Sequence, residues 1–494
     1  MEQQRPKDQS IFMDTTDGEI SIKESPSPEK TDDRDERKVR RKIDSSVLPL
    51  LFLGMLVFQL DRMNIASALT GGFAADIGVN LNTINLGNQL MFMSIVLVEI
   101  PSNIVLQKVG PRKWIACQVL AFGLVASLQI FVNGRTGFLV SRLVLGFCES
   151  GYIPAAIYTL STWYTKREHA KRVAILFFGM FGANAISPLL ATGILKLDHV
   201  RGLHGWQWLF LIEGLFTVVV SFVLIMFLPG SPSSPRPLLT PGIIKFSAQD
   251  VDILRQRIEN DNPEETAHAQ GMHIPLKLVW QTVSHYRRWP HFISTFAVFS
   301  TWGPLTTYTP SVMVSLGWDP TAANALAAVG AVLSLFFVFL VAYVSDKTNQ
   351  RGATVIVSQI CFLVALVVAR EIHPHVGRWS RWGLWTAVNA LAVGYHPAHN
   401  TWVQLNCRDP RERSISIAMF VMAAISGLMV GTQYYQADDK PFYQNGLRIQ
   451  IIMVSVGITF SVIQWGIYVV HNKHATAETH QPGVKGQSPQ IYVS

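Results

Sequence analysis

The chain has 494 residues, of which 49% are hydrophobic and only 15% are charged, whereas soluble domains contain about 25% charged residues. The formal net charge is +8, but the basic residues stand between long apolar runs, so a membrane surface explains them better than nucleic acid does. Four cysteines without CxxC spacing argue against a disulfide framework or a zinc site.

The chain opens with a polar segment and continues with apolar runs. Residues 1–45 contain two Ser-Pro pairs and end in a basic cluster, which predicts a disordered cytosolic tail rather than a signal peptide. The apolar runs that follow are about 20 residues long, the length that crosses a bilayer as a helix. They lie at 46–68, 86–106, 114–133, 137–160, 173–195, 207–228, 290–312, 321–344, 353–371, 382–405, 414–434 and 449–470. The sequence therefore predicts an all-α membrane protein with twelve transmembrane helices.

A long connection, 229–289, divides these runs into two six-helix halves, 46–228 and 290–470. It begins with a Pro- and Ser-rich stretch and then reads SAQDVDILRQRIEND, in which Ser247 can cap a helix with an apolar stripe. Residues 471–494 form a second polar tail. Six spans, a cytosolic linker and six more spans are typical of a transporter built from two repeats.

Basic residues in the short loops predict the orientation in the membrane. Four loops on the side of the N-terminus contain twelve Lys and Arg, and six loops on the other side contain eight in more residues. The positive-inside rule therefore places both termini in the cytosol. Two of the cytosolic loops, 107–113 and 345–351, match in position and predict an internal repeat, although any cytosolic loop tends to be basic. Gating or structural roles are predicted for Lys108, Arg112, Asp346, Lys347 and Arg351.

Ionisable side chains within or near the spans are the main functional signal. They are Asp61, Arg62, Glu99, Arg142, Glu149 and Glu213. Each costs about 2.5 kcal/mol or more at the bilayer centre, so such residues face a cavity or pair with one another. Arg142 and Glu149 are nearly two turns apart and point the same way from span four. Their separation of about 10 Å along the axis favours a functional role over the alternative, which is mutual neutralisation.

Different roles are predicted for these charges. Arg62 and Arg142 are expected at similar depth in spans one and four, where two guanidinium groups could bind one anion. Glu149 is expected deeper, where burial and a nearby arginine act on its carboxyl group in opposite directions. That balance suits a group that loads and unloads a proton. Asp61, Glu99 and Glu213 are expected to act in helix packing or gating.

Spans seven and ten supply further candidates. Trp302 and Tyr308, in STWGPLTTYTP (300–310), are predicted to contact the substrate. In span ten, YHPAHNTWVQLN (395–406), Pro397 should break the helix. Polar and aromatic lining is predicted from His396, His399, Asn400, Trp402 and Asn406, although a histidine could instead be hydrogen-bonded within a helix interface. Weaker candidates for the cavity wall are Asn88, Gln89 and Asn184.

Five stretches resemble the major facilitator superfamily and, more narrowly, the fungal anion:cation symporter family, the allantoate permease group. They are LDRMNIASA (60–68), EIPSNIVLQKVGPRKW (99–114), SRLVLGFCESGYIPA (141–155), WQWLFLIEG (206–214) and YYQADDKPFYQNG (434–446). Gln107 stands where the superfamily loop usually has Asp, and ISG (425–427) stands where many of these permeases have Gly-Asn. Vesicular glutamate transporters have a similar arginine in span one and Arg-x(6)-Glu in span four, which implies substrate and proton roles for Arg62, Arg142 and Glu149.

The sequence and the resemblance together predict a secondary transporter of the major facilitator fold that takes up a small organic anion with protons. A proton-antiport exporter and a non-transporting nutrient sensor are the alternatives. No phosphate-binding loop or HExxH pair is present in the sequence, so we expect no catalysis, cofactor, metal or nucleic acid. We expect a monomer in the lipid bilayer of the plasma membrane, with a small-molecule anion and protons as its partners.

Overall fold

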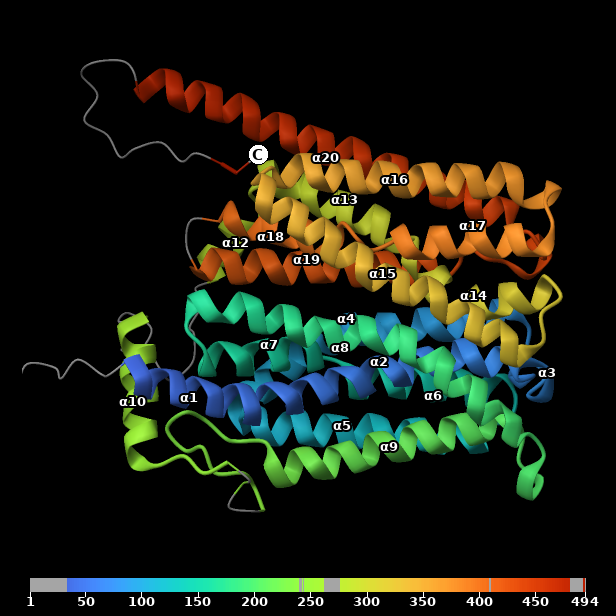
Figure 1. Cartoon of the computed structure of the whole chain (residues 1–494), viewed down its shortest axis with the longest axis horizontal. Helices are drawn as coiled ribbons and strands as arrows, with labels where there is room; N and C mark the ends of the chain where they lie inside the picture. Colours follow the sequence, from blue (N-terminus) through green and yellow to red (C-terminus); the bar gives the residue numbers. More distant parts are fainter. Residues whose placement is uncertain are drawn as a thin grey trace, which may run out of the picture.

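A computed structural model of the chain describes residues 33–239, 242, 244–261, 276–407, 410–479 and 492–493. Long helices in this part run roughly parallel in two groups that lie side by side (Figure 1). Nine of the helical segments in the described residues are long and apolar enough by themselves to cross a membrane. The predicted all-α membrane fold is confirmed.

The N-terminal half contains a helix for each of the first six apolar runs. These helices are α2 (Leu48–Thr70), α4 (Leu81–Val109), α5 (Pro111–Leu128), α6 (Gly134–Glu149) with α7 (Tyr152–Trp163), α8 (Lys166–Ile194) and α9 (Gly205–Phe227). Short elements connect them at one end: α3 (Phe73–Asp76), η1 (Gln129–Phe131), η2 (Leu195–Leu197) and η3 (Val200–Gly202).

The C-terminal half has the same organisation. Its helices are α13 (Trp289–Ser300) with α14 (Trp302–Ser315), α15 (Pro320–Thr348), α16 (Arg351–Ile372), α17 (Arg378–Leu391) with α18 (His396–Leu405), α19 (Pro410–Gly431) and α20 (Gln444–Thr479). Three 3-10 turns complete it: η4 (Tyr286–Arg288), η5 (His373–His375) and η6 (Ala437–Asp439).

The fourth, seventh and tenth spans are each broken into two helices. The tenth breaks between Leu391 and His396, as Pro397 predicted, because a proline ring clashes with the carbonyl group four residues earlier. The fourth breaks at Gly151, whose φ of 80° suits glycine. The carbonyl of Ser150 at this break accepts hydrogen bonds from Ser102 Oγ (2.7 Å) and Gln118 Nε2 (2.5 Å). These bonds satisfy the Ser150 carbonyl, which would find no hydrogen-bond donor in the lipid hydrocarbon.

The polar segments are more ordered than the sequence predicted. The structure places most of α1 (Asp33–Ser46) in the predicted disordered tail 1–45, whose first 32 residues lie outside the described part. The reason is packing, because Val39 and Ile43 of α1 are buried. The predicted linker helix is present as α10 (Ala248–Asp261), and Ser247 caps it by accepting from the Asp250 backbone (3.1 Å). A second linker helix, α12 (Leu276–Val283), was not predicted.

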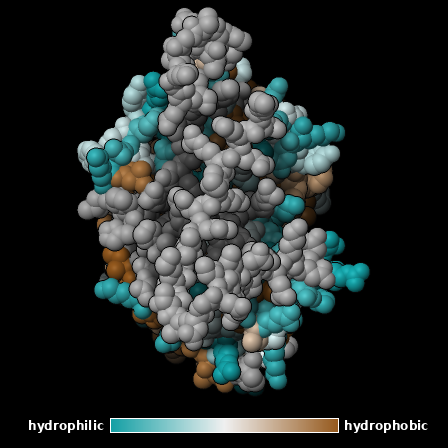
Figure 2. All heavy atoms as spheres, turned by 90° about the vertical axis from the view of Figure 1, so that its left-hand side faces the viewer, coloured by the Kyte–Doolittle hydropathy of each residue, from teal (hydrophilic) through white to brown (hydrophobic). Residues whose placement is uncertain are grey.

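The bundle has two distinct ends. We call them the α1 end, which carries α1, α10 and α12, and the α3 end, which carries α3 and the short connections of the N-terminal half (Figure 1). Figure 2 looks onto the α1 end and shows hydrophilic residues along much of its rim. The C-terminus lies toward the same end (Figure 1), and Val493 accepts a hydrogen bond from Trp402 of α18 there.

Candidate functional site

A cavity lies between the two halves. Its walls come from α2, α4, α7 and α8 on one side and from α13, α14, α18 and α19 on the other. The polar residues that line it are Gln59, Arg62, Asn88, Thr306, Thr307, His396 and Asn400. The rest of the lining is mostly apolar and aromatic, including Phe92, Phe177 and Trp302. Apolar walls with a few polar groups are the usual form of a small-molecule site.

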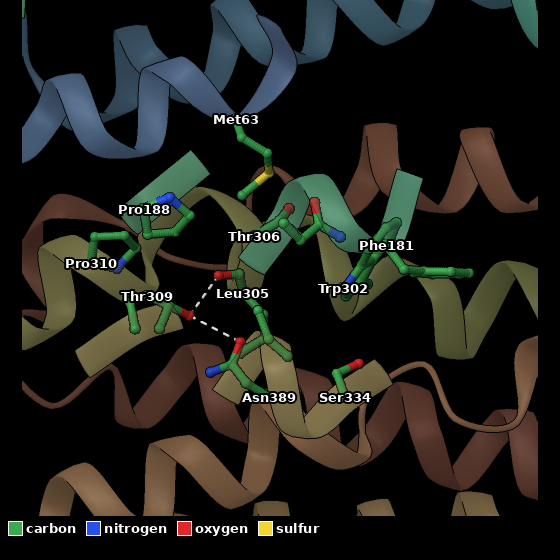
Figure 3. Close-up of a pocket in the computed structure, with 13 residues that line it drawn as sticks. Met63, Phe181, Pro188, Trp302, Leu305, Thr306, Thr309, Pro310, Ser334 and Asn389 are labelled. Atoms are coloured by element: carbon green, nitrogen blue, oxygen red, sulfur yellow. Dashed lines mark hydrogen bonds between the residues drawn. The ribbon is translucent and has the colours of Figure 1, made fainter. Parts of the chain in front are cut away.

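A smaller pocket adjoins this cavity and shares Met63, Trp302 and Thr306 with it. Figure 3 shows Trp302 and Phe181 on one side of the pocket and Thr309 on the other. Thr309 Oγ1 lies 2.6 Å from the Leu305 carbonyl oxygen and 3.1 Å from Asn389 Oδ1. These bonds fix the hydroxyl and the amide in the pocket wall.

The central charged feature is an ion pair between Arg62 and Glu149. Arg62 Nε donates to Glu149 Oε2 at 2.6 Å, and the Glu149 side chain is fully buried. The Arg62 guanidinium lies 4.1 Å from the centre of the Phe58 ring, which adds a cation–π contact. Arg62 keeps about 11% of its side chain exposed and lines the cavity. Glu149 therefore meets the cavity through Arg62.

Arg142 is close to this pair but does not bond to Glu149. Its side chain is fully buried, and none of its guanidinium nitrogens has a hydrogen-bond partner among the described residues. The guanidinium faces the Phe138 ring at 5.7 Å and lies within electrostatic range of Glu149 and Tyr308. The mutual pairing of Arg142 and Glu149, considered from the sequence, is absent from the described residues: Arg62 bonds to Glu149 Oε2, and Glu149 Oε1 has no hydrogen-bond partner there.

Tyr308 has a contact that the sequence did not suggest. Its hydroxyl group donates to Asn85 Oδ1, and Asn85 Nδ2 donates to the Tyr435 carbonyl (2.9 Å). Tyr308 is buried and joins the two halves near the α3 end. It does not line the large cavity in the described part of the chain.

The other buried carboxyl groups lie behind the cavity wall. Asp61 accepts from the Thr217 hydroxyl at 3.3 Å and lies within electrostatic range of Glu149 and Glu213. Glu213 lies against the side-chain amide group of Asn64. These contacts join α2 to α9. Glu99 is buried near Arg62, on α4.

Three predicted substrate residues of span ten lie away from the cavity lining. His399 is fully buried, and its Nε2 is hydrogen-bonded to His291 Nδ1 at 2.9 Å. This matches the alternative in which a histidine is hydrogen-bonded within a helix interface. Trp402 and Asn406 bond to Val493 instead. The residues of α18 that do line the cavity are His396 and Asn400. Both lie in the first half of α18, directly after the break.

The matching loops of the two halves have different contacts. In the second half, Arg351 forms an ion pair with Asp346 and donates to Ser345 Oγ at 3.1 Å. Lys347 lies 5.8 Å from the Tyr343 ring. In the first half, Arg112 donates to the Arg236 carbonyl of the linker, and Lys108 is exposed. The first loop has Gln107 where an acid would offer Arg112 a local partner.

Helical spacing could have identified one residue that sequence reasoning missed. Gln59 lies one turn before Arg62 on the same face of α2, and its Nε2 donates to Asn184 Oδ1 at 2.9 Å. Among the weaker candidates, Asn88 lines the large cavity and Asn184 the small pocket. Gln89 instead accepts from Gln433 at 3.1 Å. The apolar liners Phe92 and Phe177 had no distinguishing signal in the sequence.

Residues 51–432, well over half of the chain, match the sequence profile described as Major Facilitator Superfamily. The chain belongs to the major facilitator superfamily. Solved structures of this superfamily share the fold. The xylose transporter XylE from E. coli superposes with a TM-score of 0.63 at 13% identity, covering 85% of this chain and 98% of that one. A bacterial homologue of the human lysosomal transporter Spinster gives 0.62, at 13% identity, over 88% and 98%.

Curated relatives of this major facilitator protein are also transporters. An uncharacterized transporter of Saccharomyces cerevisiae is 26% identical over 89% of this chain and 81% of its own length. A protein of Agrobacterium vitis named "Putative tartrate transporter" is 28% identical over 68% of this chain and 73% of its own length. This chain is therefore a membrane-embedded secondary transporter and not an enzyme.

Proposed function

We propose that this transporter is a symporter that carries a small organic anion together with a proton through the cavity between its halves. The hydrogen bond between Arg62 and Glu149 at the cavity wall is the observation that carries the proposal. Arg62 faces the cavity and suits a carboxylate, because its planar guanidinium can donate two parallel hydrogen bonds. The "Putative tartrate transporter" relative supports an organic anion as the substrate class.

Competition for Arg62 couples the two ligands. While Glu149 is ionised, it occupies the Nε face of Arg62 at 2.6 Å and competes with an incoming anion. A proton that binds the Glu149 carboxylate removes its charge and weakens this bond, so Arg62, still cationic, can bind the anion. Release of the anion lets Glu149 lose its proton and bond to Arg62 again. One proton and one anion thus enter the cycle together.

Arg142 supplies a second positive charge in this proposal. A buried guanidinium without hydrogen-bond partners in the described residues is costly unless an anion or water approaches it. We propose Arg142 as the second anion ligand, with Trp302, His396 and Asn400 forming the wall that contacts the rest of the substrate. Of the predicted candidates, this set keeps Arg142, Trp302, His396 and Asn400 and leaves out Tyr308, His399, Trp402 and Asn406.

The finer assignments follow from the same proposal. The five motifs and the fungal relatives support membership of the allantoate permease group. Basic loops support cytosolic termini, and we propose the plasma membrane as the location. Each chain contains both halves and the cavity between them, which supports action as a monomer.

Uptake into liposomes tests the proposal. Purified protein is reconstituted, an inward proton gradient is imposed, and labelled carboxylates are offered with tartrate first. We expect gradient-driven accumulation that is lost in Glu149→Gln and kept in Glu213→Gln, a matched carboxyl-to-amide change outside the ion pair. Accumulation that Glu149→Gln leaves fully proton-dependent would contradict the coupling role. Outward flux of a metabolite that is driven by an inward proton gradient would identify an exporter instead.

A further inference from the structure

Tyr492 and Val493 are bound between α18 and α20 by the side chains of Trp402, Asn406, Tyr468 and Asn472, a set that we call the groove. Asn472 Nδ2 donates to the Tyr492 carbonyl (2.7 Å), and its Oδ1 accepts from the Tyr492 backbone N–H (2.8 Å). Asn406 binds the next residue with the same pair of hydrogen bonds. Its Nδ2 donates to the Val493 carbonyl (3.1 Å), and its Oδ1 accepts from the Val493 backbone N–H (2.8 Å). Trp402 Nε1 also donates to the Val493 carbonyl at 2.8 Å.

All four backbone polar groups of these two residues are therefore bonded by side chains of the groove. Such main-chain pairing is how proteins bind extended peptides, with a side-chain pocket adding specificity. The Tyr492 ring supplies that specificity, since it stacks on Tyr468 at 4.6 Å between ring centres and contacts His471 at 4.8 Å. Tyr468 is itself held by a hydrogen bond to His291 (3.1 Å). Tyr492 is only about 8% exposed.

The groove is connected to the cavity through α18. Trp402 and Asn406 bind the segment at one end of this ten-residue helix, and His396 and Asn400 line the cavity toward the other. Helix α18 is separated from the helices before and after it, because α17 ends at Leu391 and α19 begins at Pro410. A short helix between two breaks can shift as a rigid rod, so its position depends on what holds its ends.

We propose that the groove formed by Trp402, Asn406, Tyr468 and Asn472 is a binding site for the chain's own Tyr492–Val493 segment, and that its occupancy positions α18 and so sets the affinity of the cavity. The ligand is a peptide with an aromatic side chain followed by a residue read through its backbone. The binding site stands independently of the transported substrate. Only the effect on cavity affinity rests on the proposed function.

A peptide-binding measurement tests the site without any transport. The transporter lacking residues 480–494 is titrated with a fluorescent peptide of residues 480–494, followed by anisotropy. We expect saturable binding. A Val493→Pro peptide lacks the N–H that Asn406 accepts and should bind roughly tenfold more weakly, the factor expected for one buried polar group without its partner. The matched Val493→Ala peptide keeps that N–H and should bind within about twofold, since Val493 is bound through its backbone.

Equal binding of the Pro and Ala peptides, or no binding of the native peptide to a monodisperse truncated protein, would overturn the site. If the truncated protein is not monodisperse, the full-length Val493→Pro and Val493→Ala variants replace it. Hydrogen exchange of α18 amides should then rise in the Pro variant and not in the Ala variant. Equal exchange in the two variants would also overturn the site.

The effect on the cavity is read from uptake kinetics of the same full-length variants. We expect Val493→Pro to change KM about threefold or more with little change in the maximal rate, by analogy with the loss of a positioning contact, and Val493→Ala to leave both unchanged. An unchanged KM in Val493→Pro would overturn the link to α18. If no variant transports any anion but the peptides still differ in binding, the proposed function fails and the peptide site stands.

Discussion

Arg62 and Glu149 depend on each other because Glu149 is fully buried and Arg62, at the cavity wall, keeps only about 11% of its side chain exposed. Removing one partner of a buried ion pair typically destabilises a protein by about 3–5 kcal/mol, because the other charge stays buried without its counterion. Replacing both partners with apolar residues of similar volume is often neutral for stability. The pair therefore allows its role in folding to be separated from its role in transport.

We expect Arg62→Met to lower the apparent melting temperature in detergent, and the double variant Arg62→Met, Glu149→Met to recover most of that loss. Neither variant should accumulate substrate, since both lack the guanidinium. Tryptophan fluorescence during heating measures the stability, and liposome uptake measures the function. A double variant that still concentrates the anion would show that the pair is structural only.

At the scale of the element, α13 and α19 approach each other through glycines. A side chain at Gly431 would overlap the Ser300 carbonyl oxygen, and one at Gly427 would meet the Phe296 carbonyl. Two glycines four residues apart on one helix face let backbones pack closely, as is common between membrane helices. The stretch ISG (425–427), which stands where many permeases of the resembling family have Gly-Asn, thus includes Gly427, a glycine that allows close helix packing.

Gly431→Ala should destabilise the C-terminal half by about 1–3 kcal/mol, the usual cost of adding volume to a packed interface. Gly466→Ala is the matched control, because nothing lies within 4 Å of a side chain built there, and alanine is the better helix former by about 1 kcal/mol. Melting temperatures of the two variants in the same detergent provide the comparison. Equal destabilisation of both would contradict the close approach.

A second element, the linker helix α10, is attached by ion pairs. Arg257 Nη2 donates to both carboxylate oxygens of Glu168 at 2.9 Å, and Lys42 of α1 contacts Asp250 at 2.5 Å. Burial raises the pKa of Asp250, but the hydrogen bonds from Lys42 and Ser247 outweigh burial and leave it below its usual value. The ion pair between Asp250 and Lys42 therefore contributes its full stabilisation above the ordinary aspartate pKa. This stabilisation is lost only as the pH falls through the lowered pKa of Asp250.

We expect Arg257→Gln to raise hydrogen exchange in α10, because Glu168 loses its bidentate partner, and high salt to have a similar but smaller effect. Gln256→Ala, an exposed change on the same helix, should not alter exchange. Between pH 5 and 8, after correction for intrinsic exchange rates, the protection of α10 should stay constant because Asp250 remains ionised. Loss of protection on acidification within that range would contradict this account.

At the scale of the whole molecule, hydrogen bonds join the two halves at the α3 end. Asn324 Nδ2 donates to Thr70 Oγ1 at 2.8 Å, and Asn85 bonds to both Tyr308 and the Tyr435 carbonyl. Transport by alternating access requires one half to rock against the other around the cavity. These bonds must then break once in every cycle.

Cross-linking the two halves at the α3 end should stop transport. We expect Thr70→Cys, Asn324→Cys, made after replacement of the four native cysteines, to lose uptake with a short reducible bifunctional reagent and to regain it with reductant. Each single cysteine variant should keep its uptake under the same treatment. Uptake that persists while mass spectrometry shows complete cross-linking would mean that the α3 end does not open.

Features that depend on local chemistry could be predicted from the order of residues in the chain. Apolar runs of bilayer length determined the helices and the two halves, and Ser247 and Pro397 determined a cap and a break. Arg62 and Glu149 were identifiable as functional candidates because a charge in an apolar span is costly wherever it faces. None of these inferences requires knowing which helices touch.

Which side chains meet depends on how the helices pack in three dimensions. Glu149 pairs with Arg62 of another helix rather than with Arg142 of its own, and Asn406 binds Val493 rather than facing the cavity. The physical reason is that membrane helices are apolar on most faces, so the sequence does not indicate which face packs and which lines a cavity. Contacts between distant segments follow from helix packing, which the sequence pattern of a single span does not contain.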